Sequence, residues 1–187
     1  RVDQAAVAPL ASIGVAMSTY VAQNRGAAQW HRIRVGVYRM NLITMGLGAA
    51  LGGLVYVFGT NLAQLFFSDG NDGVVALTHR YLIINGGLYW VLSILFLLRN
   101  SIQGLGATTV PTIAGIAELA ARASVGLFLI DRIGFLGACV AAPLAWVAAL
   151  VPLAAAWFYE RRKLVVLESG GTRVAEVDAS AMQPAGA

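Results

Sequence analysis

Long apolar runs separated by short charged stretches are the feature that most constrains how this chain can fold. A concentrated basic stretch, 25–39, lies between two such runs, and each run is long enough to cross a lipid bilayer. The apolar fraction of 58%, the charged fraction of 12% and the mean hydropathy of +0.72 exceed what the core of a soluble domain requires. The sequence therefore predicts an integral membrane protein, with lipid as the solvent for much of its surface.

The length of the chain bounds the number of crossings. Each crossing takes about 20 residues plus a short loop, so five spans fit into 187 residues. We predict an all-α, polytopic transmembrane helix bundle over 1–163, with spans at 4–24, 38–67, 74–98, 112–130 and 135–159. The acidic, glycine-rich segment 68–73 is expected to form a turn. The last segment, 164–187, is rich in small and polar residues, and we expect it to be a disordered cytoplasmic tail.

The basic residues predict the orientation of these spans. The 25–39 stretch, Arg99 and the cluster Arg161, Arg162 and Lys163 fall on one side, whereas the opposite loops carry SDGNDG and DRIG. Under the positive-inside rule, the basic side and the C-terminus are cytoplasmic. The net charge of +4 and pI of 9.6 arise at the ends of spans and not on one amphipathic face, so no nucleic-acid partner is expected.

The chain opens inside an apolar run, without an initiator methionine or a small-residue cleavage site. We therefore expect it to be the C-terminal part of a larger transporter. Its first partner would then be the missing N-terminal lobe of the same polypeptide.

Glu118 and Arg122 are the strongest local signal for chemistry. They lie four residues apart in the fourth predicted span, so they share a helix face and can pair. Ionisable groups inside a span are costly and usually face protein or a water-filled cavity. Two roles remain open at this point: a structural ion pair that locks the bundle, and coupling to a cation or substrate.

Asn85 and Tyr89 form a second candidate pair inside the third span. Four residues apart, they could present a hydrogen-bonding group and a ring to an organic cation, although ordinary packing between helices is the competing interpretation. Gly48 and Gly52 in the second span have the same spacing and allow another backbone to approach closely. Prolines at 9, 143 and 152 would give bends, either static or used in alternating access.

No pattern in the chain indicates an enzyme. A phosphate-binding loop, a metal-spaced cluster of His and Cys, and a nucleophile elbow are all missing from the sequence. The single cysteine, Cys139, lies in an apolar run and is expected to pack there. We therefore predict no catalytic residue, no metal and no cofactor.

Two loops share the pattern Q-x-x-G-A, one beginning at Gln23 and one at Gln103. Both follow a predicted span on its cytoplasmic side, and each glycine can end a helix. Repeated units are common in secondary transporters. The match is short, but it is consistent with an internal repeat.

Three segments together resemble a known family: RVDQAAVAPLASIGVAMSTYVAQNRGA, LLRNSIQGLGATTVPTIAGIAELAARASV and GFLGACVAAPLAWV. They resemble the C-terminal lobe of multidrug and toxic compound extrusion (MATE) transporters, in order and over most of 1–163. The family has twelve helices in two lobes, and the five spans look like its helices eight to twelve. The pattern E-L-x-x-R seen in relatives matches Glu118 and Arg122.

The resemblance implies export of small organic, often cationic compounds in exchange for H⁺ or Na⁺, across a bacterial plasma membrane. One branch of the family places a carboxylate of its cation site in the tenth helix, but the third span here has no acid between Arg80 and Arg99. A coupling role for Glu118 is therefore our own inference. Two alternatives remain: a lipid-linked precursor flippase of the same superfamily, and a non-transporting membrane scaffold.

Overall fold

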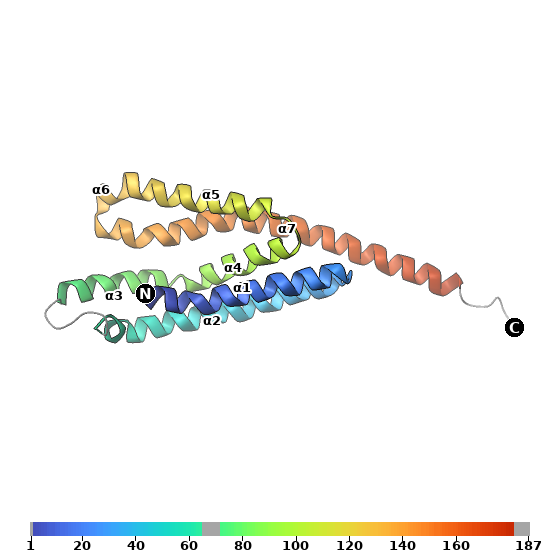
Figure 1. The fold of residues 1–187 in the computed structure, drawn as a ribbon, viewed down its shortest axis with the longest axis horizontal. Coiled ribbons are helices and arrows are strands. Elements are labelled where there is room, and N and C mark those ends of the chain that lie inside the picture. Colours follow the sequence, from blue (N-terminus) through green and yellow to red (C-terminus); the bar gives the residue numbers. More distant parts are fainter. Residues whose placement is uncertain (1, 65–71, 182–187) are drawn as a thin grey trace.

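The computed structural model describes residues 2–64 and 72–181, and every secondary-structure element in these two stretches is a helix (Figure 1). The predicted all-α fold class is therefore confirmed. The elements follow one another as α1 (Val2–Gly26), α2 (Trp30–Gln64), α3 (Asp72–Gly86), α4 (Tyr89–Gly104), α5 (Thr109–Ser124), the π-helix η1 (Val125–Leu129), α6 (Ile130–Ile133) and α7 (Phe135–Ala181).

Three stretches of helix among the described residues are long and apolar enough to cross a membrane, and a bent pair makes a fourth when counted as one span. The three are Trp30–Gly59, Thr109–Leu129 and Phe135–Gly170, and the bent pair is Ala76–Gly86 with Tyr89–Gly104. Within the part of the chain that the structure describes, α1 is not among these candidates. Residues 65–67 of the predicted second span and most of the predicted turn at 68–73 lie outside the described residues.

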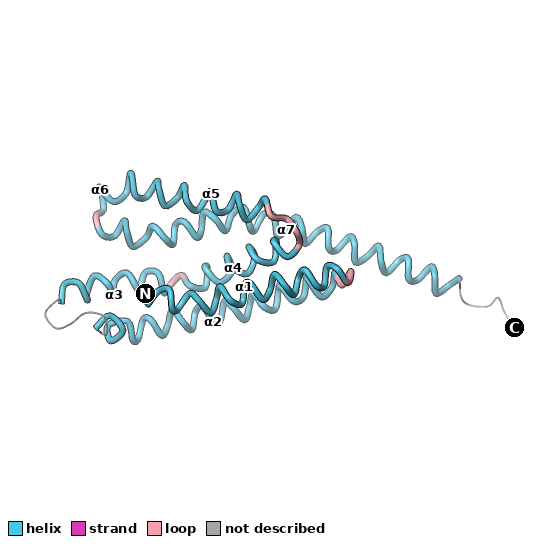
Figure 2. Tube along the Cα trace, in the orientation of Figure 1, coloured by secondary structure: helices cyan, strands magenta, loops and turns pink. Residues whose placement is uncertain are grey.

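Helix α4 lies at the centre of the bundle. It packs against α1 and α2 on one side and against α7 and α5 on the other, as the arrangement of the tubes in Figure 2 shows. Nine of its sixteen residues are buried, including Leu95, Leu97 and Ile102. The outer helices instead expose apolar side chains such as Val57 of α2, Leu119 of α5 and Val151 of α7. This outward apolar surface fits a bundle whose solvent is lipid.

The third predicted span is broken. Helix α3 ends at Gly86 and α4 begins at Tyr89, and the two axes are bent by 51°. Gly87 and Leu88 connect them, with the Leu88 amide donating to the Asn85 carbonyl at 3.0 Å. The continuous span predicted over 74–98 is therefore corrected to two helices that reach from Asp72 to Gly104.

The glycine pair of α2 packs against this break. A Cβ atom on Gly48 would lie 2.7 Å from the carbonyl oxygen of Tyr89, and one on Gly52 would collide with the carbonyl oxygen of Gly86. The predicted close approach at Gly48 and Gly52 is thus confirmed, and its partner is the junction between α3 and α4. A side chain at either position would push the two backbones apart.

The two Q-x-x-G-A loops meet at one end of the bundle. Arg25, in the first loop motif, donates through Nη1 to the carbonyl oxygen of Leu105 in the second. Gly106 has a φ of 78°, which only glycine adopts without strain, and it turns the chain from α4 into α5. The contact fixes the α1–α2 connection against the α4–α5 connection.

Helix α7 continues well beyond the predicted fifth span, as its long ribbon in Figure 1 shows. It runs through Pro143 and Pro152 and ends at Ala181. Leu164 is buried, and Glu168 pairs with two side chains of α2. These contacts give the segment after residue 163 a packed helical start, whereas the sequence predicted a disordered tail over 164–187. Residues 182–187 lie outside the described residues.

Candidate functional site

The predicted pair of Glu118 and Arg122 forms in α5. Nη2 of Arg122 donates to Oε1 of Glu118 at 2.9 Å, across one helical turn. The Glu118 side chain is 21% exposed and that of Arg122 is 45% exposed, so the pair lies at the edge of the protein interior. Such a pair within one helix is a short-range contact that does not by itself hold two helices together.

Arg99 is the partner that sequence reasoning missed. It belongs to α4, and its Nη2 donates to Oε2 of Glu118 at 3.0 Å. One carboxylate is therefore shared by two guanidinium groups, and the Arg99 contact joins the central helix to α5. The signal that could have found it is the short α4–α5 connection at 105–108, which folds the part of α4 that carries Arg99 back beside α5.

The electrostatics of this cluster restrict what it can bind. Both carboxylate oxygens of Glu118 already accept a hydrogen bond from an arginine. One negative charge faces two positive charges, so the cluster repels a further cation unless an ion pair opens first. Nε of Arg99 is buried and has no hydrogen-bond partner among the described residues, which leaves a donor for an anionic or neutral group.

Asn85 and Tyr89 lie on opposite sides of the helix break, Asn85 near the end of α3 and Tyr89 at the start of α4. Both side chains are 0% exposed. Nδ2 of Asn85 donates to the Tyr81 carbonyl at 3.0 Å and to the Cys139 carbonyl of α7 at 3.4 Å. The Tyr89 ring lies 6.5 Å from the Trp146 ring of α7, tilted by 48°.

These contacts fit the packing interpretation of Asn85 and Tyr89. Both residues fasten the broken span to α7 and face its side chains or backbone. A substrate-binding role for the pair stays a prediction, and it would require α7 to move away. Oδ1 of Asn85 is buried without a hydrogen-bond partner among the described residues, so the amide retains an acceptor.

No group of three or more His, Cys, Asp or Glu side chains that could hold a metal ion occurs in the described stretches 2–64 and 72–181. Cys139 is buried, as expected for a packing residue. Among the described residues, the ion pairs that join two helices form two clusters, one around Glu118 and one around Glu168.

A bundle of apolar helices with one broken span defines a polytopic helical membrane protein. Within that class, the model of the MatE family matches residues 1–127, more than half of the chain. The chain belongs to the MatE family. The resemblance seen in the sequence segments is thereby confirmed.

A curated relative supports the same assignment. The chain is 30% identical over 112 residues to a Bacillus subtilis (strain 168) protein named "Probable multidrug resistance protein YoeA". The match covers 58% of this chain and 23% of that protein, so it spans about a quarter of the relative's length. No solved structure matches the chain.

Proposed function

We propose that this chain forms part of a secondary active exporter, which moves small organic and often cationic compounds out of a bacterial cell in exchange for H⁺ or Na⁺. The observation that carries the proposal is the family match over 1–127, together with the name of the Bacillus subtilis relative. The partner that completes the transport path would be an N-terminal lobe of the same polypeptide. The protein would lie in the plasma membrane, with its C-terminus in the cytoplasm.

The broken span supports a transport role. Transporters often build their binding sites around discontinuous helices, because the interruption leaves backbone groups available to substrates and ions. Here the interruption lies between α3 and α4, and it is covered by α2 and fastened to α7 through Asn85. Movement of α7 away from this point would expose polar backbone and the Asn85 amide.

Efflux of a fluorescent organic cation from cells that express the full-length protein tests the proposal. The Na⁺ gradient and the pH gradient are collapsed separately. We expect efflux to stop when one of the two gradients is removed, and that gradient identifies the coupling ion. Absence of efflux above the empty-vector control, with protein present in the membrane, would overturn the exporter and favour the flippase or the scaffold.

For Glu118, we propose that the locking role dominates over the coupling role. Both of its oxygens are engaged by arginines from two helices, as expected for a group that holds α4 against α5. In Glu118→Gln, we expect less folded protein, by about 1–3 kcal/mol of stability, because two arginines lose their counter-charge. Efflux per folded molecule should stay gradient-dependent.

A control variant separates this effect from general charge removal. Glu160→Gln removes a carboxylate that pairs with Lys163 three residues along the same helix, so it should change little. A fully folded Glu118→Gln protein that has lost its gradient dependence would instead assign Glu118 to ion coupling.

A further inference from the structure

A groove of about 570 Å³ lies between α2, α4 and α7, and its lining does not include Glu118, Arg99 or Arg122. Arg34, Tyr38 and Asn41 line it from α2, at spacings that place them on one helix face. Trp157, Phe158 and Arg161 line it from α7, and the remaining wall is aliphatic. The groove therefore combines two guanidinium groups with three aromatic rings.

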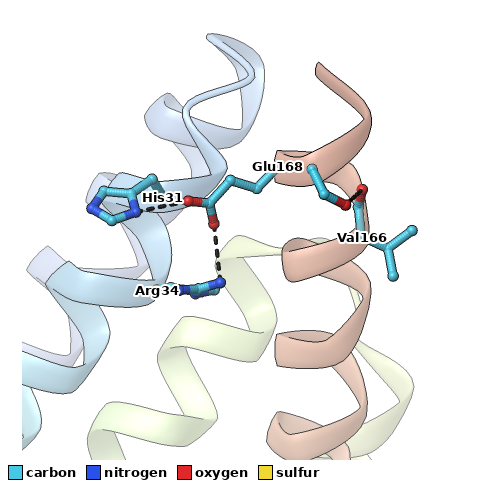
Figure 3. Close-up of polar contacts among 5 residues, drawn as sticks. His31, Arg34, Val166 and Glu168 are labelled. Carbon is cyan, nitrogen blue, oxygen red and sulfur yellow. Dashed lines mark hydrogen bonds and ion pairs between the residues drawn. The ribbon is translucent and has the colours of Figure 1, made fainter. Parts of the chain in front are cut away.

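The position of Arg34 is fixed by Glu168 of α7. Figure 3 shows the Glu168 carboxylate between His31 and Arg34: its Oε2 lies 3.0 Å from Nη1 of Arg34, and its Oε1 lies 2.8 Å from Nδ1 of His31. Glu168 thus holds the Arg34 side chain beside the groove and compensates part of its charge.

Arg161 brings a second positive charge to the same groove. Among the described residues, no acidic group lies within ion-pair distance of it, and its neighbour Glu160 pairs with Lys163 instead. With two arginines and the single carboxylate of Glu168, the groove carries a net positive charge. Oδ1 of Asn41 is buried and has no hydrogen-bond partner in the described part of the chain, so this oxygen can still accept a hydrogen bond from a donor such as a hydroxyl group.

We propose that this groove binds the headgroup of an anionic phospholipid. Paired guanidinium groups match phosphate oxygens in charge and geometry. The side on which the sequence places the 25–39 stretch and Arg161 is the cytoplasmic side, where the leaflet is negatively charged. Tyr38 is 66% exposed and Phe158 is 60% exposed, so an acyl chain can leave the groove along apolar side chains. The net positive charge disfavours an organic cation, which separates this groove from the exporter's proposed substrate site.

Quenching of Trp157 measures the occupant directly. The full-length protein is reconstituted in liposomes whose phosphatidylglycerol or phosphatidylcholine carries brominated acyl chains, which quench tryptophan fluorescence. The quenching at Trp157 is the quenching measured in the parent protein minus that measured in Trp157→Phe. We expect phosphatidylglycerol to be favoured over phosphatidylcholine by about fivefold at Trp157, the effect of one uncompensated arginine near a membrane surface. The preference should disappear in Arg34→Gln/Arg161→Gln.

A matched double variant, Arg32→Gln/Arg162→Gln, removes two charges from the same two helices, close to Arg34 and Arg161 in sequence, without touching the groove lining. This variant should retain the preference for phosphatidylglycerol over phosphatidylcholine. Arg161→Gln alone leaves the Arg34–Glu168 pair intact, so it should fold normally and still lose most of the selectivity.

Three outcomes would overturn the proposal. In the first, the parent protein shows no preference between the two lipids. In the second, the two double variants lose the preference for phosphatidylglycerol equally. In the third, millimolar inorganic phosphate displaces the quenching lipid. The last would show a site for a free anion. None of these readouts depends on transport, so the lipid site can fail or stand independently of the proposed exporter.

Discussion

Arg99 and Arg122 contact the same carboxylate but contribute different kinds of stability. Arg122 pairs with Glu118 within one helix and is 45% exposed, whereas Arg99 reaches across from another helix and is 23% exposed. Exposed pairs within one helix are worth about 0.3–0.5 kcal/mol, and solvent screening reduces them further. The contact that holds the bundle together is therefore the one between helices.

We expect Arg99→Gln to lower stability by about 1–3 kcal/mol and Arg122→Gln to lower it by about 0.5 kcal/mol or less. The thermal unfolding midpoint of the detergent-purified, full-length protein measures both effects. Equal losses in the two variants would contradict the distinction between the pair within α5 and the contact from α4 to α5.

Individual contacts were predictable from the sequence only where the spacing was short. Glu118 and Arg122 share a face at four residues, so any helix there brings them together. Arg99 lies nineteen residues before Glu118, and their contact depends on how α4 and α5 pack. The contact between Asn85 and the Cys139 carbonyl spans 54 residues and has no local signature.

At the scale of elements, the contact between α2 and the helix break depends on glycines, which have no side chain to hold the two backbones apart. Gly52 lies against the Gly86 carbonyl, whereas a Cβ atom added to the neighbouring Gly53 would meet no atom of another element within 4 Å. Two adjacent glycines therefore experience opposite surroundings on the same helix.

We expect Gly52→Ala to destabilise the protein by about 1–3 kcal/mol, because the added methyl group forces α2 away from the α3–α4 junction. Gly53→Ala should be neutral or stabilising by up to about 1 kcal/mol, since alanine favours helix and meets no obstacle. Fluorescence-detected size-exclusion chromatography after heating compares the two. A Gly52→Ala protein as stable as Gly53→Ala would show that α2 does not rest on the junction.

The elements themselves followed from hydropathy and charge, but their internal breaks did not. The apolar runs predicted helices in the observed order, with Arg25 in the last turn of α1 and the turn at Gly134 before α7, whereas α4 continues past the predicted end at Arg99 to Gly104. The break after Gly86 falls inside an uncharged run, at Asn85-Gly86-Gly87, and these turn-forming residues are a local signal that the search for long apolar runs overlooked. The π-helical turn at Val125–Leu129 has no such signal in composition, because it shifts the backbone bonding and not the residue types.

At the scale of the whole molecule, the ends of the bundle differ in charge. The α1–α2 connection, the Leu105 carbonyl that Arg25 contacts, and the Arg34–Glu168 pair all belong to one end, and the α6–α7 turn at Gly134 lies at the other (Figure 1). The family match makes this a membrane protein, and the positive-inside rule predicts that the first end lies in the cytoplasm.

Cysteine labelling tests that orientation without any assumption about transport. Cys139 is buried, so it is first replaced by alanine in the full-length protein to give a background without reactive thiols in this chain. Ala27→Cys and Arg132→Cys then place one thiol in an exposed position at each end of the bundle. We expect a membrane-impermeant maleimide to label Arg132→Cys in intact cells and to label Ala27→Cys only after the membrane is permeabilised. The reverse pattern would place the arginine-lined groove at the outer leaflet, where the electrostatic argument for an anionic lipid no longer holds, and labelling of both thiols in intact cells would contradict a bundle that crosses the membrane between them.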